Sequence, residues 1–427
     1  MLIQFSVKNW RSIRDEQTLT MVKAKSSELE ESNTFAPKSI SNTRLLRSAV
    51  IYGANAAGKS NLISALRTMK SVVQDSAGKQ SGDELPVTPF RLDNQTLNAP
   101  SEFEVIFITD GIKYQYGFTA TKNQVHEEWL IAYPNNRAQK WFARALDLST
   151  NEHQWQLGSA LTGQKQLWVE STRSNALFLS TATQLNSQQL KPVYDWFKST
   201  LRISGVSGWT PTYTAKSCDH PDRRVKVLDF LKAADLDIKD LTITSEKYTV
   251  NHLPEAFPEE MKKTFVDKMK DTLMYDIKTV HENAQGDLVE FDFHEESDGT
   301  RKLFSFAGPW LDVLSKGRVL FVDELHDNLH PKLVSFLVSL FHSEKTNPNN
   351  AQLVFTTHET SILNQDVFRR DQIWFCEKEK DQSTRLYPLT DFSPRKGREN
   401  LEAAYLSGRY GALPYIRNLV FKETNNG

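Results

Sequence analysis

The chain has 427 residues, of which 39% are hydrophobic and 25% charged, and it contains 24 Phe and 9 Trp. This composition is typical of a folded protein with a buried core and excludes an intrinsically disordered chain. The formal net charge of −1 gives no indication of a generic basic nucleic-acid binder. The length accommodates two or three domains, or one large α/β domain with an insertion.

The cysteine content and the N-terminal region indicate a reduced compartment. Cys218 and Cys376 alone cannot make a disulfide framework or a four-ligand zinc site, so we expect two reduced, part-buried thiols. The first ten residues lack a charged leader followed by a long apolar run, so we expect no signal peptide. No stretch approaches the roughly 18 to 20 apolar residues that a membrane helix needs. The simplest expectation is a cytoplasmic protein without a membrane partner.

The N-terminal region predicts a strand, a loop, a second strand and a helix. Residues 3 to 7 alternate between apolar and polar side chains, which is typical of a half-buried strand. The polar stretch from Lys23 to Arg44 favours a surface loop. Ser48 to Tyr52 form a short apolar strand that enters a glycine-containing turn. Residues 60 to 73 carry apolar side chains at helical spacing, so a helix is expected directly behind this turn.

The middle of the chain predicts strands first and helices afterwards. Strand patterns dominate from residue 86 to 168, and Asp110-Gly111 between two apolar runs indicates a hairpin. An antiparallel β-subdomain is therefore expected. Residues 185 to 275 favour helices, and the clearest pieces are 190–201, 224–234 and 258–273.

The last third returns to an α/β pattern. Val319 to Val322 form a continuous apolar run, as expected for a strand buried on both faces. A helix is predicted over residues 331 to 341, followed by an apolar strand from Gln352 to Thr356. This strand–helix–strand order predicts a parallel crossover. Residues 373 to 375 are a further strand candidate.

One glycine-rich segment matches a phosphate-binding loop at every fixed position of G-x-x-x-x-G-K-[ST]. These positions are Gly53, Gly58, Lys59 and Ser60. The glycines let backbone amides curl around phosphate oxygens, and the following helix adds free N–H groups and the positive end of its dipole. Lys59 is expected to reach the terminal phosphates of ATP, and Ser60 to offer its hydroxyl to Mg²⁺.

A pair of carboxylates follows the apolar run 319–322. Asp323 and Glu324 end a predicted parallel strand, where such sheets bind ligands. Asp323 is predicted to serve the hydrated Mg²⁺, and Glu324 to polarise or deprotonate the attacking water. Alone, this pattern also fits a strand that enters a charged turn. The phosphate loop elsewhere in the chain favours the nucleotide-binding interpretation.

Histidines near the predicted strand ends allow two interpretations. His358 follows a strand that should neighbour the Asp323 strand, so it is predicted as a sensor of the γ-phosphate or the water. A histidine at a strand end is also commonly a polar turn residue. His326 and His330 have a spacing found in zinc sites, but the sequence is not H-E-x-x-H and Pro331 predicts a helix start.

These motifs together resemble the ABC-type ATPases of the SMC and RecF group, and more closely the stand-alone bacterial AAA_15/AAA_21-type proteins. Lys8-Asn-Trp-Arg-Ser12 is similar to the KNFRS opening of that group, and Asn55 fits its G-x-N-x-x-G-K-S variant. The segment from Glu296 to Thr300 lies where the group has its signature motif, although it departs from the LSGGQ form. The tail 405–414 resembles that of the abortive-infection AbiLi/RloA type.

The resemblance covers nearly the whole chain and implies an α/β fold. The expected architecture is an ABC-type P-loop NTPase head, with a mixed or parallel sheet and flanking helices, an antiparallel β-subdomain and an α-helical insertion. Residues 1–180 would form the N-terminal ATPase half with the phosphate loop and β-subdomain. Residues 181–280 would form a mainly helical insertion or lid, and residues 281–427 the C-terminal ATPase half.

The resemblance also implies a head-to-tail homodimer, or a higher oligomer, closed around ATP. Ser297 and Gly299 of one protomer would act on the nucleotide of the other, and residues 325–330 would form the D-loop at the dimer seam. The predicted ATP contacts are Gly53, Asn55, Ala57, Gly58, Lys59, Ser60, Asn61, Ser297 and Gly299. The predicted catalytic residues are Lys59, Glu324 and His358, and the predicted Mg²⁺ ligands are Ser60 and Asp323. The sequence does not identify the Q-loop glutamine of this group. Gln95 and Gln115 are the two candidates.

The leading hypothesis for function is a slow, dimer-dependent ATPase that acts as sensor or regulatory subunit of an anti-phage system. It would control a separately encoded effector such as a nuclease or toxin. The alternative is a RecF/SMC-like ATPase that clamps DNA in DNA repair or maintenance, and DNA or RNA is a candidate partner. Its candidate phosphate contacts are Arg223, Arg224 and Lys226, or Arg395, Lys396 and Arg398, although solvated surface charge is the commoner explanation of such residues. A transporter motor would need a membrane partner and an ordinary signature motif.

Overall fold

The computed structural model describes residues 1–40, 43–205, 208–249, 257–269, 272–395, 397 and 399–415. The chain divides into two compact units. The first unit comprises Met1–Ile203, Gly317–Leu325 and Val338–Gly427, and the second unit comprises Ser204–Lys316 and His326–Leu337. Both units contain segments from separate parts of the chain. The sequence predicts three consecutive domains, and this division stays a prediction. The two compact units do not follow its boundaries.

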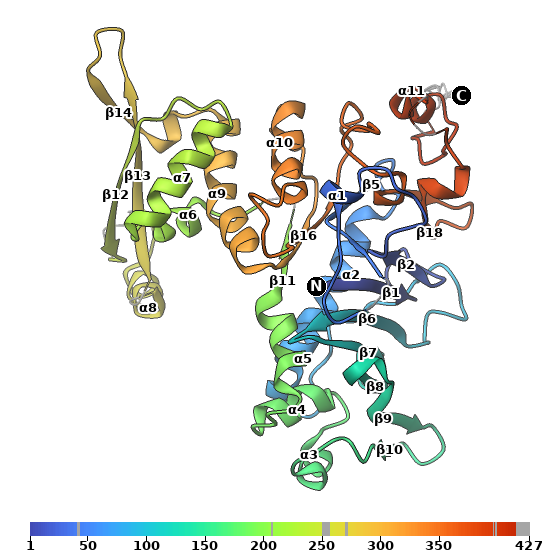
Figure 1. Ribbon diagram of the computed structural model, residues 1–427. Coiled ribbons are helices and arrows are strands. Elements are labelled where there is room, and N and C mark those ends of the chain that lie inside the picture. Colours follow the sequence, from blue (N-terminus) through green and yellow to red (C-terminus); the bar gives the residue numbers. More distant parts are fainter. Residues whose placement is uncertain are drawn as a thin grey trace, which may run out of the picture. The chain divides into compact units, whose positions relative to one another are not determined.

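A six-stranded sheet of the first unit carries the predicted α/β core (Figure 1). The strand order is β11-β15-β16-β5-β17-β18. The strands are β11 (Leu201–Ser204), β15 (Val319–Val322), β16 (Gln352–Thr356), β5 (Ser48–Tyr52), β17 (Ile373–Lys378) and β18 (Thr384–Pro388). The pairs β15/β16, β16/β5 and β5/β17 are parallel, whereas β17/β18 is antiparallel. The predicted strands in this core are confirmed.

Strand β16 lies between β5 and β15, and this placement determines which turns lie close together at the carboxyl edge of the sheet. The predicted crossover from β15 through α10 (Pro331–His342) to β16 is confirmed as a parallel pair. Residues of β5, β15 and β16 are all buried, which explains their continuous apolar runs. Because the three strands run parallel, their carboxyl ends bring the following turns to one edge.

A seven-stranded antiparallel sheet forms the other large sheet of the first unit, in the order β10-β9-β8-β7-β6-β1-β2. Its strands are β1 (Leu2–Lys8), β2 (Gln17–Thr20), β6 (Ser101–Thr109), β7 (Ile112–Ala120), β8 (Val125–Tyr133), β9 (Gln139–Asp147) and β10 (Glu152–Leu157). The predicted hairpin turns at Asp110 and Gly111, both with positive φ. The predicted antiparallel β-subdomain is confirmed, and β1 and β2 extend it.

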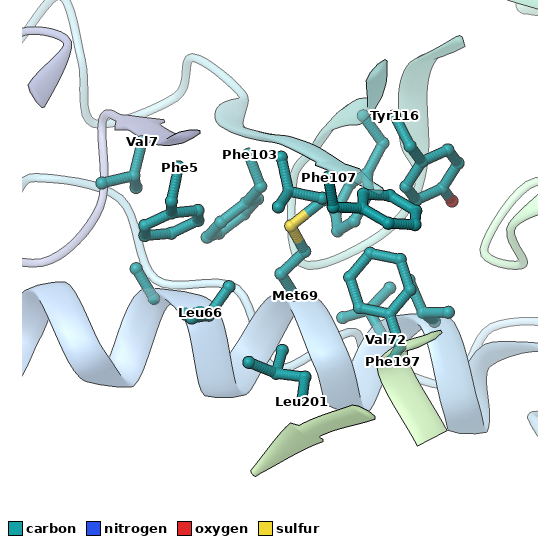
Figure 2. Packing of buried hydrophobic residues seen from close by; sticks show 14 of the residues in the cluster. Phe5, Val7, Leu66, Met69, Val72, Phe103, Phe107, Tyr116, Phe197 and Leu201 are labelled. Carbon is teal, nitrogen blue, oxygen red and sulfur yellow. The ribbon is translucent and has the colours of Figure 1, made fainter. Parts of the chain in front are cut away.

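Helix α2 (Lys59–Asp75) contributes side chains to the core that joins both sheets. Figure 2 shows Leu66, Met69 and Val72 of this helix beside phenylalanines of β1 and β6. The same core includes Ala49 and Ile51 of β5. The helix is therefore fixed by apolar contacts along its length, which holds its N-terminus at the end of β5.

The polar stretch from Lys23 to Arg44 is more ordered than the predicted surface loop. It contains α1 (Glu30–Asn33) and β3 (Thr34–Phe35), which pairs with β4 (Leu45–Leu46). Asn33 is 2% exposed, and its amide donates to the carbonyl of Val367 and to Gln372 Oε1. A polar sequence favours solvent exposure, but here hydrogen-bond partners in the interior satisfy the buried side chain of Asn33.

The second unit combines helices with a three-stranded antiparallel sheet, β12-β13-β14. Its strands are β12 (Asp240–Lys247), β13 (Leu273–Glu282) and β14 (Leu288–Asp292), and its helices are α6 (Pro211–Ser217), α7 (Pro221–Ala233), α8 (Glu259–Met269) and α9 (Asp298–Lys316). The helices predicted over 224–234 and 258–273 are found, and the sheet was not predicted. In the part of the chain described, no helix is long and apolar enough to cross a membrane.

Candidate nucleotide site

The loop between β5 and α2 has the backbone that its glycines were predicted to allow. Gly58 has φ of 106°, in the left-handed region that favours glycine. A Cβ at Gly58 would overlap the Thr384 hydroxyl, so this position also needs the absence of a side chain. Ala56 has φ of 63°, an uncommon value for a residue with a Cβ. The loop is therefore a specific, tightly fitted turn at the start of α2.

Lys59 begins α2 and is only 4% exposed. Its ammonium donates to the carbonyls of Gly53 at 2.9 Å and Ala54 at 3.2 Å. Burial lowers the pKa of Lys59 from its ordinary value, and the carboxylate of Glu324 opposes that shift. Its cationic head thus lies inside the curve of the loop, where phosphate-binding loops direct their lysine.

Asp323 and Glu324, the acid pair, directly follow β15, and a hydroxyl of the neighbouring strand β16 forms hydrogen bonds with both residues. Thr356 Oγ1 donates to Asp323 Oδ1 at 2.7 Å and accepts from the backbone N–H of Glu324 at 2.8 Å. Glu324 has φ of 54°, a left-handed conformation that turns the chain at the strand end. Asp323 is 6% exposed, whereas the Glu324 side chain is 19% exposed. The two carboxylates therefore lie in different environments within one turn.

Lys59, Glu324 and His358 converge at the carboxyl edge of β5, β15 and β16. Glu324 Oε1 lies 4.0 Å from Lys59 Nζ and 3.3 Å from His358 Nε2. Lys59 Nζ lies 3.2 Å from His358 Nε2. The structure thus brings together the three residues predicted to be catalytic, although Lys59 is about 260 to 300 positions from the other two in the chain. A cation, a carboxylate and an imidazole in mutual reach suit phosphoryl transfer to water.

Ser60 and Asp323 supply the oxygen groups that suit Mg²⁺. Mg²⁺ prefers oxygen ligands, is held by one or two protein groups, and completes its shell with water and substrate phosphates. Ser60 is exposed at the first turn of α2, and Asp323 ends β15. The described residues hold no group of three or more His, Cys, Asp or Glu side chains placed for a metal. The donors present fit a phosphate-bound Mg²⁺ rather than an all-protein cage.

Several side chains behind the loop were not recognised from the sequence. Thr384 Oγ1 and Cys376 Sγ both donate to the carbonyl of Ala57, at 2.9 and 3.2 Å. Burial raises the pKa of Cys376 to about 12, so it remains a neutral thiol. Asn61, predicted as an ATP contact, donates its side-chain amide to Ser12 Oγ at 2.7 Å. The only sequence signal for these supporting side chains was the Lys8–Ser12 motif.

Other predicted residues belong to other elements of the chain. Ser297 and Gly299 belong to the second unit, where Ser297 Oγ accepts from the N–H of Thr300 at the start of α9. Their predicted role on a partner's nucleotide stays a prediction. Gln115 lies in β7, and its amide group donates to Glu104 and accepts from Tyr133. These placements identify no Q-loop glutamine.

The histidine pair considered for zinc also belongs to the second unit. His330 Nδ1 accepts from the backbone N–H of Lys332, at the start of α10. Helix α10 begins at Pro331, as predicted. Among the described residues, neither histidine belongs to a group of three or more His, Cys, Asp or Glu side chains that could hold a metal ion.

The parallel core, the glycine loop before α2 and the acid pair after β15 define an α/β P-loop nucleotide-binding fold. Comparison with protein families agrees with this class. Residues 48–364 match the family AAA_21, described as "AAA domain, putative AbiEii toxin, Type IV TA system". Because the match extends over most of the chain, the protein belongs to this family of AAA ATPase domains.

Solved structures of similar fold come from the SMC and RecF proteins. The SMC head domain from Thermotoga maritima has 12% sequence identity and a TM-score of 0.40, over 91% of this chain and 98% of that one. The recombination mediator protein RecF with ATP has 12% identity and a TM-score of 0.38, over 91% and 99% of the respective chains. Comparison with curated proteins finds no significant match.

Proposed function

We propose that this protein binds ATP with Mg²⁺ and hydrolyses it. The observation that carries this proposal is the convergence of Lys59, Glu324 and His358 within 4.0 Å beside the phosphate loop. The AAA family supports the same chemistry. Such a loop binds phosphates through backbone amides and the helix N-terminus, so the substrate would be a nucleoside triphosphate.

Each residue has a distinct part in the proposed reaction. Lys59 binds the terminal phosphates and stabilises the charge that develops on them. Glu324 orients the attacking water and accepts its proton, and His358 contacts the γ-phosphate or that water. Ser60 and Asp323 would hold Mg²⁺, which when bound neutralises phosphate charge. The Lys59 ammonium has three donors, so it can bind a phosphate and still keep a contact with the carbonyl of Gly53 or Ala54.

Replacing Glu324 with Gln tests the proposed water activation. The change keeps the shape of the side chain and removes its basicity, so kcat for phosphate release should fall about a hundredfold or more. ATP affinity, measured by calorimetry, should remain near the wild-type value because the loop is intact. Glu152→Gln, on the exposed edge of β10, is the matched control and should leave kcat unchanged. Wild-type turnover in Glu324→Gln would refute the role given to Glu324.

We further propose that the ATPase works as a head-to-tail homodimer. Ser297 of one protomer would then act on ATP held by the loop of the other. A mixture of the Lys59→Ala and Ser297→Glu variants, each inactive alone, should regain activity, because the mixed dimer has one site with both parts intact. Their separate solutions are the control. No recovery from mixtures shown to contain mixed dimers would contradict completion of the site by the partner.

The biological role that we propose is control of a separately encoded effector in an anti-phage system. The family description names a toxin of a type IV toxin–antitoxin system, which supports a defence locus with a partner gene. The similarity of residues 405–414 to the AbiLi/RloA type points the same way. Co-purification of a neighbouring gene product, retained with Glu324→Gln and ATP, is expected. Failure to retain any such product under these conditions would contradict this role.

Binding of nucleic acid, as in the RecF/SMC-like alternative, is the second candidate function. Arg223 and Lys226 are exposed on α7 and available to phosphates, whereas Arg224 is engaged by Asp240 at 2.7 Å. Of the other candidates, Arg395 is exposed, and Lys396 and Arg398 lie outside the described residues. ATP-strengthened binding to duplex DNA, weakening steeply with salt and lost in Arg223→Ala/Lys226→Ala, would favour this candidate. Unchanged binding in that variant would exclude these contacts.

A further inference from the structure

Two hydroxyl groups from opposite ends of the chain meet directly behind the phosphate loop. Ser12 Oγ lies 2.7 Å from Thr384 Oγ1, and the backbone N–H of Thr384 donates to the carbonyl of Ser12 at 2.7 Å. Thr384 is 4% exposed. Both residues lie outside the segment 48–364 that the family describes, so family membership gives neither of them a role.

These hydroxyls belong to a chain of hydrogen bonds that runs in one direction. Asn61 Nδ2 donates to Ser12 Oγ at 2.7 Å, and Thr384 Oγ1 donates to the carbonyl of Ala57 at 2.9 Å. The hydrogen of Thr384 is used on Ala57, so Ser12 must donate to Thr384. Each hydroxyl thus donates once and accepts once, an arrangement in which neighbouring bonds strengthen one another.

The chain of hydrogen bonds begins and ends on the phosphate-binding segment. Ala57 lies inside the loop, and Asn61 lies in the first turn of α2. Between them Gly58 packs so closely that an added Cβ would overlap Thr384 Oγ1 and approach Ser12 Oγ to 2.9 Å. The loop and the first turn of α2 are therefore tied to a common support.

The support itself is rigid. Ser12 follows a turn in which Asn9, 2% exposed, donates its amide to the carbonyls of Thr96 and Ala99 at 3.0 and 2.9 Å. Asn9 Oδ1 accepts from the N–H of Phe90 at 2.9 Å. Trp10 is 1% exposed and packs edge-on against an aromatic ring of β6. The Lys8–Ser12 motif thus holds Ser12 in a fixed position.

We propose that Asn61, Ser12 and Thr384 form a clamp that positions the phosphate loop for ATP. The proposal rests on the proposed function and assigns positioning residues, since none of the three needs to touch the reacting atoms. A loop held before binding does not have to be ordered by the nucleotide. Because the loop amides bind phosphate in both the ground state and the transition state, the clamp should affect affinity more than kcat.

Thr384→Val tests the clamp, because valine has nearly the same shape and lacks the hydroxyl. KM and the calorimetric Kd for ATP should both rise about tenfold, the equivalent of one or two hydrogen bonds, while kcat changes little. Thr384→Ser keeps the hydroxyl and should restore KM. Thr18→Val is the matched control, because it breaks a similar pair, Ser6 with Thr18 at 2.9 Å, away from the loop.

The alternative outcome is a purely structural role for Thr384. In that case Thr384→Val would lower the melting temperature and the kcat per protein, with KM unchanged, and the clamp would be overturned. If Thr384→Val does not fold, the same measurement of KM is made on Ser12→Ala, which should also show a higher KM. The double variant should raise KM by less than the product of the single effects, because both changes break one chain of hydrogen bonds. Independent effects would contradict the clamp.

The clamp and the proposed function fail in different ways. A wild-type protein that does not bind ATP would overturn both. Wild-type binding with an unchanged KM in Thr384→Val and Ser12→Ala would overturn the clamp alone.

Discussion

Two glutamates of the first unit lie beside cations, and their surroundings differ in one decisive way. Glu128, in β8, is 0% exposed and lies 3.0 Å from Arg144. Glu324, after β15, is 19% exposed and lies 4.0 Å from Lys59 and 3.3 Å from His358. The ion pair of Glu128 and Arg144 is fully buried, whereas the partly exposed group of Glu324, Lys59 and His358 can exchange its contacts for a ligand.

The partners of Glu128 explain why it is structural. Its two oxygens accept from Tyr116 Oη, Arg144 Nε and the backbone N–H groups of Phe178 and Leu179. These N–H groups open helix α4 (Phe178–Gln184), so the carboxylate also caps that helix. Every acceptor position is in use. The comparison teaches that a charged residue becomes a candidate for chemistry when part of its side chain is exposed, so that a ligand can approach it.

Glu128→Gln should have the largest effect on stability, because it leaves the buried Arg144 without a compensating charge. Loss of one partner of a buried ion pair costs about 3–5 kcal/mol of unfolding free energy. Urea unfolding should show this loss, while KM for ATP in the folded protein stays constant. Glu324→Gln should show the reverse, with lost turnover and nearly unchanged stability. Equal effects of both changes on stability would break the comparison.

Thr356→Val should have an intermediate effect, on the active edge itself. It removes the hydroxyl that binds Asp323 Oδ1 and the N–H of Glu324, so the acid pair loses its fixed geometry. We expect kcat to fall about tenfold, as for the loss of about 1–2 kcal/mol of hydrogen bonding. Thr119→Val in β7 is the matched control, because the buried Thr119 hydroxyl has no partner. A full kcat in Thr356→Val would mean that the hydroxyl does not position the acids.

A third effect concerns the pH dependence of stability and a buried histidine at the other end of β5. Burial lowers the pKa of His342 to about 3, and its Nε2 lies 2.8 Å from Ser48 Oγ. Between this pKa and the unfolded value of about 6.5, the unfolded chain binds a proton that the native protein does not. Stability should therefore decline as pH falls below about 6.5, by about 1.4 kcal/mol per pH unit.

Melting temperatures from pH 7 to pH 5 test this dependence. The wild-type protein should lose more stability over this range than His342→Gln, which lacks the titrating group. His294→Gln removes an exposed histidine and should follow the wild type. Parallel curves for the wild type and His342→Gln would contradict the link between this burial and acid sensitivity.

The core strands and the main site residues could be predicted from the sequence because their patterns are local. Strands β5, β15 and β16 are buried on both faces and therefore read as continuous apolar runs. The phosphate loop needs residue types at fixed spacing, and the acid pair directly follows a strand. Each of these signals lies within a few residues of the chain.

The supporting residues could not be predicted because their roles depend on which strands become neighbours. Thr356 reaches Asp323 since β16 pairs with β15, and Thr384 reaches Ala57 since β18 lies beside β17 at that end of the sheet. Neither threonine belongs to a spaced motif. Strand β12 was missed because it is largely exposed and shows little apolar alternation.

The central claim is that the 53–60 loop and the 323–324 acids bind one triphosphate. A crystal structure with Mg²⁺ and a non-hydrolysable ATP analogue tests it most directly. The account predicts the γ-phosphate in contact with Lys59 Nζ, Mg²⁺ next to Ser60 and Asp323, and a water between Glu324 and the phosphate. An analogue bound elsewhere, or bound at the loop with the acid pair out of reach of its phosphates, would contradict the account.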